Sequence, residues 1–569
     1  MKKIATTLAF ALPNPLPKPA GAASPKGTFR LTLALLGVLL AASAAFTFRR
    51  ITQEEIIQLL RQSAVDGTAA YFTDSDRSVY LSASFREVYA SHAYQPLWSE
   101  NGQPAPQLDS LLSALGRADQ EGLVPATYHL ARLEETLAAI ALHPDAEKVV
   151  QLDQLATAAY LTYAAHLSGG SMSPARLDTN WHVVARHLPL AGYLSGALRE
   201  GTVGQSLAGL LPGAESGYPA LKRELQRLKA IARRGGWPAL PVTHVLQKND
   251  SGQAVTTLRH ILAATGDLDS ARVDFPRFDA DLQAGLRRFQ GRHGLTPTGK
   301  VDKSTLRALN VPVGERIGQV TLNLERMRWL PRQPDDRFIS VNIPEYKLRV
   351  VEQHRPVLEA NVVVGKPDHA TPIFADTLES IVFSPEWNVP GQIATREILP
   401  LVQRNPYYLQ KNNFEVFDSW NANAKPVNPY SINWREVTPE HFKYRIVQKA
   451  NGKNALGAVK FLFPNSLNIY IHDTPAKQLF QERRRAFSHG CVRLENPEKL
   501  AVYLLQNTGD WSPEKVQAQL HGTAPVKVLL AQPVKVQITY LTAFVQDGAL
   551  QFRDDVYGYD PQQLAVLLP

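Results

Sequence analysis

Two short stretches near the C-terminal end of the 569-residue chain contain the residue types that acyl transfer requires. The first holds His472 and Asp473, and the second holds His489, Gly490 and Cys491, the only cysteine. A thiol becomes a strong nucleophile once a neighbouring histidine accepts its proton, because the thiolate is the reactive form. Glycine beside it lets a substrate approach the backbone closely, and successive N–H groups there can form an oxyanion hole. The residues therefore indicate acyl transfer through a thioester.

Arg493, two residues after the cysteine, adds a positive charge that stabilises a thiolate or binds a substrate carboxylate in a bidentate pair. Other interpretations stay open: that Cys491 is inert and buried, that His489 only hydrogen-bonds inside its loop, or that His472, His489 and Cys491 hold a zinc ion. No helical histidine spacing and no second metal motif accompany them, and one cysteine forms neither a CxxC motif nor an intramolecular disulfide. We therefore expect no metal and no cofactor.

The composition excludes several classes of protein. Apolar residues make up 44% of the chain and charged residues 20%, which argues against a disordered or fibrous protein, and the length predicts three or four domains. The formal charge is +9, but the first 50 residues hold seven basic and no acidic residues. The remainder carries 54 basic against 52 acidic residues, so no nucleic-acid partner is expected.

Residues 31–48 form an uncharged segment bracketed by arginines. Eighteen residues are at the short end of what crosses a bilayer as a helix. Five basic residues precede the segment and two follow it, which favours a cytoplasmic N-terminus and an exported body. Ala42-Ser43-Ala44 offers the alternative of a cleaved signal peptide. We expect a cytoplasmic lead over residues 1–30, an inner-membrane anchor or signal segment over residues 31–48, and a periplasmic body, where an unpaired thiol needs a functional reason.

Helical patterns dominate the first half of that body. Residues 53–240 repeat apolar positions every three or four residues and predict a helical scaffold domain. Residues 244–311 predict a bundle of three short helices, the first with helical spacing from Val245 onward. The third covers residues 303–309, with Asp302 or Ser304 as its N-cap.

From Phe338 the apolar pattern becomes strand-like, and residues 338–530 predict a mainly β catalytic domain. Strands are expected at residues 338–343, 347–351, 360–364, 381–383, 459–463 and 468–471. Residues 395–455 interrupt the domain with polar, asparagine-rich and aromatic sequence, and an insert of that length is typical of a lid or a binding element. One more strand is expected at residues 534–544, within a C-terminal extension over residues 531–569. The predicted fold class is multidomain α+β.

The motif HDTP from His472, followed by SHGCVRL from Ser488, resembles the catalytic signature of L,D-transpeptidases, the cysteine enzymes that cross-link bacterial peptidoglycan. Residues 244–311 resemble the small peptidoglycan-binding repeat of cell-wall enzymes. The layout is similar to the large membrane-anchored subgroup, with anchor, scaffold, peptidoglycan-binding repeat and catalytic domain with lid. Further matching pieces are Val364-Gly365-Lys366 with Thr371-Pro372, FSPEWNVP over residues 383–390 and KFLFPN over residues 460–465.

The resemblance implies a role for each motif residue. Cys491 matches the nucleophile and His472 the general base, which the backbone carbonyl of Asp473 would orient. Where many relatives have glycine, the carboxylate of Asp473 can additionally raise the pKa of the imidazole. The oxyanion-hole amides would come from His489, Gly490 and Cys491. The residues that shape the pocket would be Tyr470, Ser488 and Arg493.

The resemblance also implies the reaction, a cross-link between two diaminopimelates made from tetrapeptide stems with loss of D-Ala. A lid would suppress hydrolysis of the thioester by excluding water. Carbapenems are expected to acylate Cys491, and other cell-wall synthesis enzymes are expected partners. Two alternatives stay open: a cell-wall cysteine peptidase that uses water as acceptor, and a non-catalytic peptidoglycan-binding protein.

Overall fold

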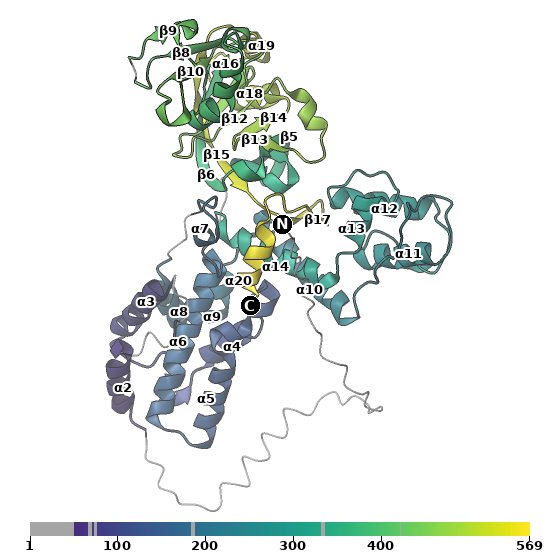
Figure 1. Cartoon of the computed structure of the whole chain (residues 1–569). Coiled ribbons are helices and arrows are strands. Elements are labelled where there is room, and N and C mark those ends of the chain that lie inside the picture. The colour runs from purple at the N-terminus through teal and green to yellow at the C-terminus, as the bar shows by residue number, and fades with distance from the viewer. Residues whose placement is uncertain are drawn as a thin grey trace, which may run out of the picture. The chain divides into compact units, whose positions relative to one another are not determined.

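The computed structural model describes residues 51–66, 71–72, 77–183, 188–331, 336–421 and 423–568 (Figure 1). The chain divides into two compact units, residues 1–51 and 52–569, and all described elements belong to the second. The expected cytoplasmic lead and membrane segment lie outside the described residues. Within the described ranges, no helix combines the length and apolarity needed to span a membrane. The mixed helical and β architecture with a β-rich catalytic region is confirmed there.

The helical region is built around one long central helix. α6 is buried along almost its whole length and packs against α2, α3, α5 and α8. On α6, the Asp153 carboxylate accepts hydrogen bonds from the Tyr89 hydroxyl at 2.7 Å and the Trp98 N–H at 2.8 Å. Burial raises the pKa of Asp153 to about 6 in spite of these bonds. The helices are α2 (Gln53–Asp66), α3 (Ser78–Ser91), α4 (Pro106–Leu115), α5 (Leu130–Leu142), α6 (Ala146–Gly169), α7 (Pro174–Leu177), α8 (Leu190–Glu200), α9 (Val203–Ala208) and α10 (Tyr218–Arg233).

A smaller helical unit follows, with its own apolar core. Asp302 caps its third helix by accepting a hydrogen bond from the Thr305 N–H at 2.8 Å. The first helix begins at Gln253 rather than near Val245, and Leu246 instead pairs with Val301 in an isolated bridge. The helices are α11 (Gln253–Thr265), α12 (Ala280–Arg292) and α13 (Lys303–Leu309).

A nine-stranded sheet follows α14 (Val313–Trp329). The strand order is β13-β5-β14-β12-β11-β6-β15-β3-β4, and β4 also pairs with β5, so eight of the strands close into a barrel. Each of the six expected strands overlaps a strand of this sheet. The strands are β3 (Arg337–Asn342), β4 (Lys347–Glu352), β5 (Arg355–Gly365), β6 (Phe374–Phe383), β11 (Val459–Leu462), β12 (Ile471–His472), β13 (Ala486–Ser488), β14 (Val492–Leu494) and β15 (Val526–Thr539).

The segment expected to be a lid folds as a small α/β unit, here called the insert subdomain (residues 387–448). Its four-stranded sheet has the order β7-β10-β8-β9. Short helices cover this sheet, and an apolar core that includes Val402, Val416 and Trp434 fills the space between them. The elements are β7 (Trp387–Asn388), α15 (Gly391–Ile393), a π-helical turn (Ala394–Ile398), α16 (Leu399–Arg404), α17 (Tyr408–Lys411), β8 (Phe414–Phe417), β9 (Pro426–Val427) and β10 (Arg445–Gln448).

The end of the chain completes the barrel. β15 lies between β6 and β3 and runs parallel to β3, so the strand expected from Val534 begins earlier and ends at Thr539. A hairpin follows, and α20 packs on α14. The remaining elements are α18 (Pro497–Leu505), α19 (Pro513–Leu520), β16 (Ala543–Gln546), β17 (Ala549–Phe552) and α20 (Tyr559–Leu567).

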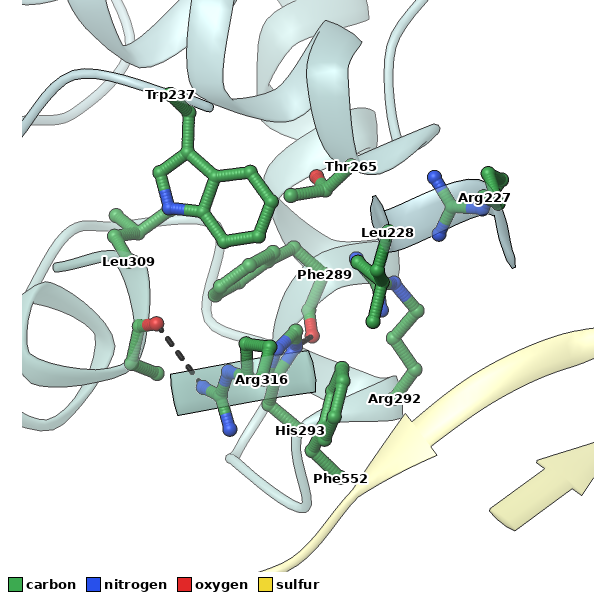
Figure 2. Close-up of a pocket in the computed structure, with 11 residues that line it drawn as sticks. Arg227, Leu228, Trp237, Thr265, Phe289, Arg292, His293, Leu309, Arg316 and Phe552 are labelled. Atoms are coloured by element: carbon green, nitrogen blue, oxygen red, sulfur yellow. Dashed lines mark hydrogen bonds between the residues drawn. The ribbon is translucent and has the colours of Figure 1, made fainter. Parts of the chain in front are cut away.

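A packed joint lies where α10, α12, α14 and β17 meet (Figure 2). The His293 imidazole stacks on Phe289 with ring centroids 3.8 Å apart and on Phe552 at 5.3 Å. The Arg316 guanidinium lies 4.3 Å from the Phe552 ring centroid and donates to the carbonyl of Ala308. The cavity among these side chains is about 10 Å³, room for one water at most. The joint is packed core rather than a ligand site.

Candidate active site

Three neighbouring strands place Lys460, His472 and Arg493 in one row. Lys460 of β11 is directly opposite His472 of β12, and His472 is directly opposite Arg493 of β14. Side chains in register on adjacent strands point to the same face of a sheet. The imidazole of His472 therefore lies between an ammonium group and a guanidinium group.

Burial and one backbone hydrogen bond fix the His472 ring. The residue is 5% exposed, and its Nδ1 donates to the Asp473 carbonyl oxygen at 2.5 Å. This bond sets the tautomer and leaves Nε2 to accept a proton. Burial lowers the pKa of His472 to about 3, and the charges of Arg493 and Lys460 act in the same direction. Hydrogen bonds with the backbone of Asp473 and Leu456 oppose the shift only in part.

The Asp473 side chain contacts the backbone near the base and a lysine. Its Oδ2 accepts a hydrogen bond from the Ala458 N–H at 2.8 Å, and its Oδ1 pairs with Lys477. The carboxylate thus holds the backbone around the base, while the carbonyl of the same residue contacts the ring. The pKa of His472 is lowered overall, chiefly by burial and the charge of Arg493, so a raising effect of this carboxylate stays a prediction.

The Cys491 thiol is half-buried on the loop before β14 and lies 3.7 Å from the Asn468 carbonyl oxygen. Burial raises the pKa of Cys491 to about 11. Hydrogen bonds from Tyr470 and the charges of Arg493 and Lys460 oppose this shift. At neutral pH the resting pair is therefore a neutral thiol and a neutral imidazole.

The Ser488 side chain holds the loop that carries the thiol. Its Oγ accepts from the Gly490 N–H at 3.2 Å and donates to the Cys491 carbonyl at 2.5 Å. Gly490 has a φ of +110°, a left-handed conformation that glycine adopts readily. In this structure the Gly490 N–H is engaged by Ser488, and its expected role as an oxyanion-hole amide stays a prediction. In the described part of the chain, the N–H groups of His489 and Cys491 have no internal acceptor, so these two amides remain available.

A second set of hydrogen bonds, here called the brace, connects this loop to two other segments of the chain. The Thr371 hydroxyl donates to the Gly490 carbonyl at 2.7 Å and accepts from the Gly365 N–H at 2.9 Å. The Tyr557 hydroxyl, from the C-terminal extension, accepts from the Thr371 N–H at 3.1 Å and donates to the Gly365 carbonyl at 2.9 Å. The brace fixes the backbone beside the nucleophile.

Tyr470 and Arg493 both lie next to His472. The Tyr470 ring stands edge-on to the His472 ring with centroids 5.6 Å apart. Burial raises the pKa of Tyr470, whose hydroxyl hydrogen-bonds with Cys491 and with Trp387 of the insert subdomain. Arg493 is half-buried, and its Nε has no hydrogen-bond partner.

The His489 side chain contacts the insert subdomain and His369. Its Nε2 lies 2.5 Å from the Glu397 carboxylate of the insert subdomain, and its ring centroid lies 5.0 Å from that of His369. His489 is therefore a contact between the nucleophile loop and the insert. Among the residues that the structure describes, no group of three or more histidines, cysteines or carboxylates is arranged to hold a metal ion.

Sequence reasoning missed five residues of the site. Thr371, Trp387 and Lys460 stand inside pieces that matched the resemblance, so a signal existed but gave them no role. Glu397 and Tyr557 had no signal, because each reaches the site from a segment distant in sequence.

Three family models match the chain: a "Scaffold domain" over residues 83–225, a "Putative peptidoglycan binding domain" over residues 251–309, and an L,D-transpeptidase catalytic domain over residues 336–528. A curated Haemophilus influenzae protein named "Putative L,D-transpeptidase" is 34% identical over 244 residues. That match covers 43% of this chain and 48% of the relative, so it spans about half the length of the relative.

Solved L,D-transpeptidase structures are also similar. One from Stackebrandtia nassauensis is 14% identical with a TM-score of 0.21, covering 52% of this chain and 96% of that chain. One from Xylanimonas cellulosilytica is 14% identical with a TM-score of 0.16, covering 52% and 98%. At these TM-scores the likeness carries no argument. The family models, in contrast, confirm the resemblance for the catalytic and the peptidoglycan-binding domain.

Proposed function

We propose that this chain, which carries an L,D-transpeptidase catalytic domain and a peptidoglycan-binding domain, cross-links two diaminopimelate residues of peptidoglycan through a Cys491 thioester. The observation that carries the proposal is that Tyr470 contacts both groups of the dyad. Its ring lies 5.6 Å from the His472 ring, whose Nδ1 is held by the Asp473 carbonyl, and its hydroxyl bonds with the half-buried Cys491 thiol. The hydrogen bonds of Tyr470 with Cys491 support the same assignment.

In the first half-reaction, Nε2 of His472 takes the thiol proton and Cys491 Sγ attacks the diaminopimelate carbonyl of a tetrapeptide donor. The N–H groups of His489 and Cys491 stabilise the oxyanion. The bond from that carbon to the D-Ala nitrogen breaks, and the His472 imidazolium gives its proton to the leaving amine. D-Ala departs and a thioester remains.

In the second half-reaction, the side-chain amine of diaminopimelate from a second stem attacks the thioester carbon. His472 takes a proton from that amine, and the Cys491 thiolate leaves and recovers a proton. The new bond joins two diaminopimelates. The insert subdomain, which contacts the loop through Glu397 and His489, would exclude water while the thioester exists.

The test is incubation of the purified chain with a diaminopimelate-containing disaccharide tetrapeptide, with products read by mass spectrometry. We expect a dimer that lacks one D-Ala, absent with Cys491→Ala and with His472→Ala. A shortened monomer alone would instead establish the cysteine peptidase. Wall binding without turnover would establish the non-catalytic binding protein.

The remaining expectations belong to the same proposal. An inner-membrane anchor over residues 31–48 would hold the catalytic domain in the periplasm, near cell-wall synthesis enzymes. Carbapenems would acylate Cys491, because their strained ring is an acyl donor. Fractionation of cells that express the tagged chain, and intact mass measurement after carbapenem treatment, test these points separately.

A further inference from the structure

Two positive charges at the active site have no anionic partner within the part of the chain that the structure describes. Neither Lys460 nor Arg493 forms an ion pair with a carboxylate there, although both are half-buried. Among the described residues, the only group whose charge favours the cationic form of Arg493, and likewise of Lys460, is the Cys491 thiol. That thiol is neutral in the resting enzyme, since burial raises its pKa to about 11.

Half-burying a cation without a counter-ion is unfavourable, so such a pair of cations is typical of a site that receives an anion. A cation–ring contact shows where Lys460 lies. The Lys460 ammonium is 5.7 Å from the Tyr470 ring centroid, and the Tyr470 hydroxyl bonds with Cys491. The two charges therefore flank both the base and the nucleophile.

We propose that Lys460 and Arg493 form a carboxylate clamp. In the first half-reaction the clamp binds the α-carboxylate of the D-Ala that leaves, and in the second it binds the carboxylate on the carbon that bears the attacking diaminopimelate amine. This assignment rests on the proposed function. It adds a binding site and names the chemistry of its ligand.

The chemistry of the two half-reactions explains why one clamp serves both. The leaving nitrogen of D-Ala must lie next to the His472 ring to receive its proton, and the D-Ala carboxylate is attached to the carbon that bears this nitrogen. The attacking amine of diaminopimelate is likewise attached to a carbon that bears a free carboxylate. His472 is in register between Lys460 and Arg493, so a carboxylate two bonds from the reacting nitrogen falls between the two cations.

The alternative role for these cations is to stabilise the thiolate alone. A thiolate exists only until the thioester forms, whereas the two cations remain in place throughout. The two roles make different predictions. A clamp discriminates between an acid and its amide, while thiolate stabilisation affects both substrates equally.

The first experiment measures acylation of Cys491 by intact mass, with the full-length chain and three tetrapeptide donors. One donor has a free terminal carboxylate, one has a terminal carboxamide, and one has a free terminus but a carboxamide on the diaminopimelate side chain. We expect the terminal carboxamide to acylate the wild-type enzyme at least roughly tenfold more slowly, and the side-chain carboxamide to acylate it normally. In Lys460→Met the tenfold difference should disappear, and Lys460→Arg should restore part of it.

The second experiment adds acceptors to preformed acyl-enzyme. We expect an acceptor with a free diaminopimelate carboxylate to react faster than its carboxamide, again only when Lys460 is present. The matched control is Lys535→Met, since Lys535 is an exposed lysine of the same sheet bonded to Thr377. This control should discriminate as the wild type does.

Several results would overturn the clamp. Equal loss of rate for the acid and the amide in Lys460→Met would assign Lys460 to the thiolate. Slower acylation only by the side-chain carboxamide would assign the cations to the other carboxylate of the donor. If the wild type is never acylated, the proposed function fails. The clamp is then tested separately, by calorimetric measurement of how tightly Cys491→Ala binds the acid and the amide. Tighter binding of the acid than of the amide would support the clamp, and equal binding would refute it.

Discussion

Nε2 of His489 and the carboxylate of Glu397 lie 2.5 Å apart and join the nucleophile loop to the insert subdomain. The two residues are 92 positions apart in sequence. Since the insert has its own core, this contact couples two separately packed units. The hydrogen bond between Tyr470 and Trp387 is a second connection between the site and the insert subdomain. If the insert excludes water as proposed, loosening these contacts should favour hydrolysis of the thioester.

Removing the charge of Glu397 should loosen this connection. We expect Glu397→Gln to raise the ratio of hydrolysed monomer to cross-linked dimer by a few-fold, because a partly exposed carboxylate–histidine contact contributes up to about 1 kcal/mol. The measurement is the product ratio by mass spectrometry. Glu436→Gln, which changes an exposed carboxylate of the same subdomain, is the control. An unchanged ratio in both variants would mean that this contact does not restrain the insert.

The neutral state of the resting pair predicts how the thiol reacts with pH. With the pKa of Cys491 at about 11 and that of His472 at about 3, only a small fraction is thiolate at pH 7. We expect alkylation by iodoacetamide to accelerate about tenfold per pH unit from pH 7 upward, with no step between pH 5 and pH 7. The hydrogen bond from Tyr470 lowers the thiol pKa, so removing it in Tyr470→Phe should raise that pKa and slow the reaction at each pH. A plateau below pH 8 would instead reveal a thiolate–imidazolium pair in the free enzyme.

Burial of Asp153 predicts a second pH effect, on stability. Its pKa is raised from an ordinary value of 3.8 to about 6 in the folded chain. Its stabilising contribution is therefore complete below pH 3.8 and is lost as the pH rises through 6, by roughly 3 kcal/mol in total. We expect Asp153→Asn to flatten the fall in Tm between pH 5 and pH 7.5, measured by calorimetry. The exposed carboxylate variant Asp510→Asn should keep the wild-type slope, and an equal slope in all three proteins would contradict the prediction.

The parts of this fold that the sequence predicts are those with a local signal. The strands near Val341 and Val350 alternate apolar and polar residues, the strand near Val363 is a run of valines, and Asp302 precedes a short helix as an N-cap. β13 and β14 escape prediction because each has three residues and flanks the nucleophile loop. A strand period is not visible over so short a distance.

The residues of the site likewise fall into those that have a local sequence signal and those that have none. The motifs identify Cys491 and His472 because the chemistry depends on residue type and close spacing. The row that places Lys460 beside His472 depends on the register of β11 and β12, which side-chain patterns do not reveal when both strands are short. The partners of the Asp473 carboxylate, the Ala458 N–H and the Lys477 ammonium, depend on the tertiary fold and are not predictable from the motif.

The brace behind the nucleophile loop gives the last prediction. The Tyr557 hydroxyl is the hydrogen-bond partner of both the Thr371 N–H and the Gly365 carbonyl, 192 residues away from the latter. Tyr557→Phe leaves both backbone groups without this partner, so we expect a loss of about 1–3 kcal/mol in the free energy of unfolding. Because Thr371 also holds the Gly490 carbonyl, kcat should fall more than KM changes.

Denaturant titration and steady-state kinetics measure the two effects of Tyr557→Phe. Tyr503→Phe is the matched control, since the Tyr503 hydroxyl donates to Glu352 outside the site. If the two variants lose equal stability but only Tyr557→Phe loses kcat, the hydroxyl of Tyr557 positions the nucleophile loop in addition to stabilising the fold. If both keep full kcat, the loop is held by Ser488 and Thr371 alone, and the C-terminal extension serves only to complete the barrel.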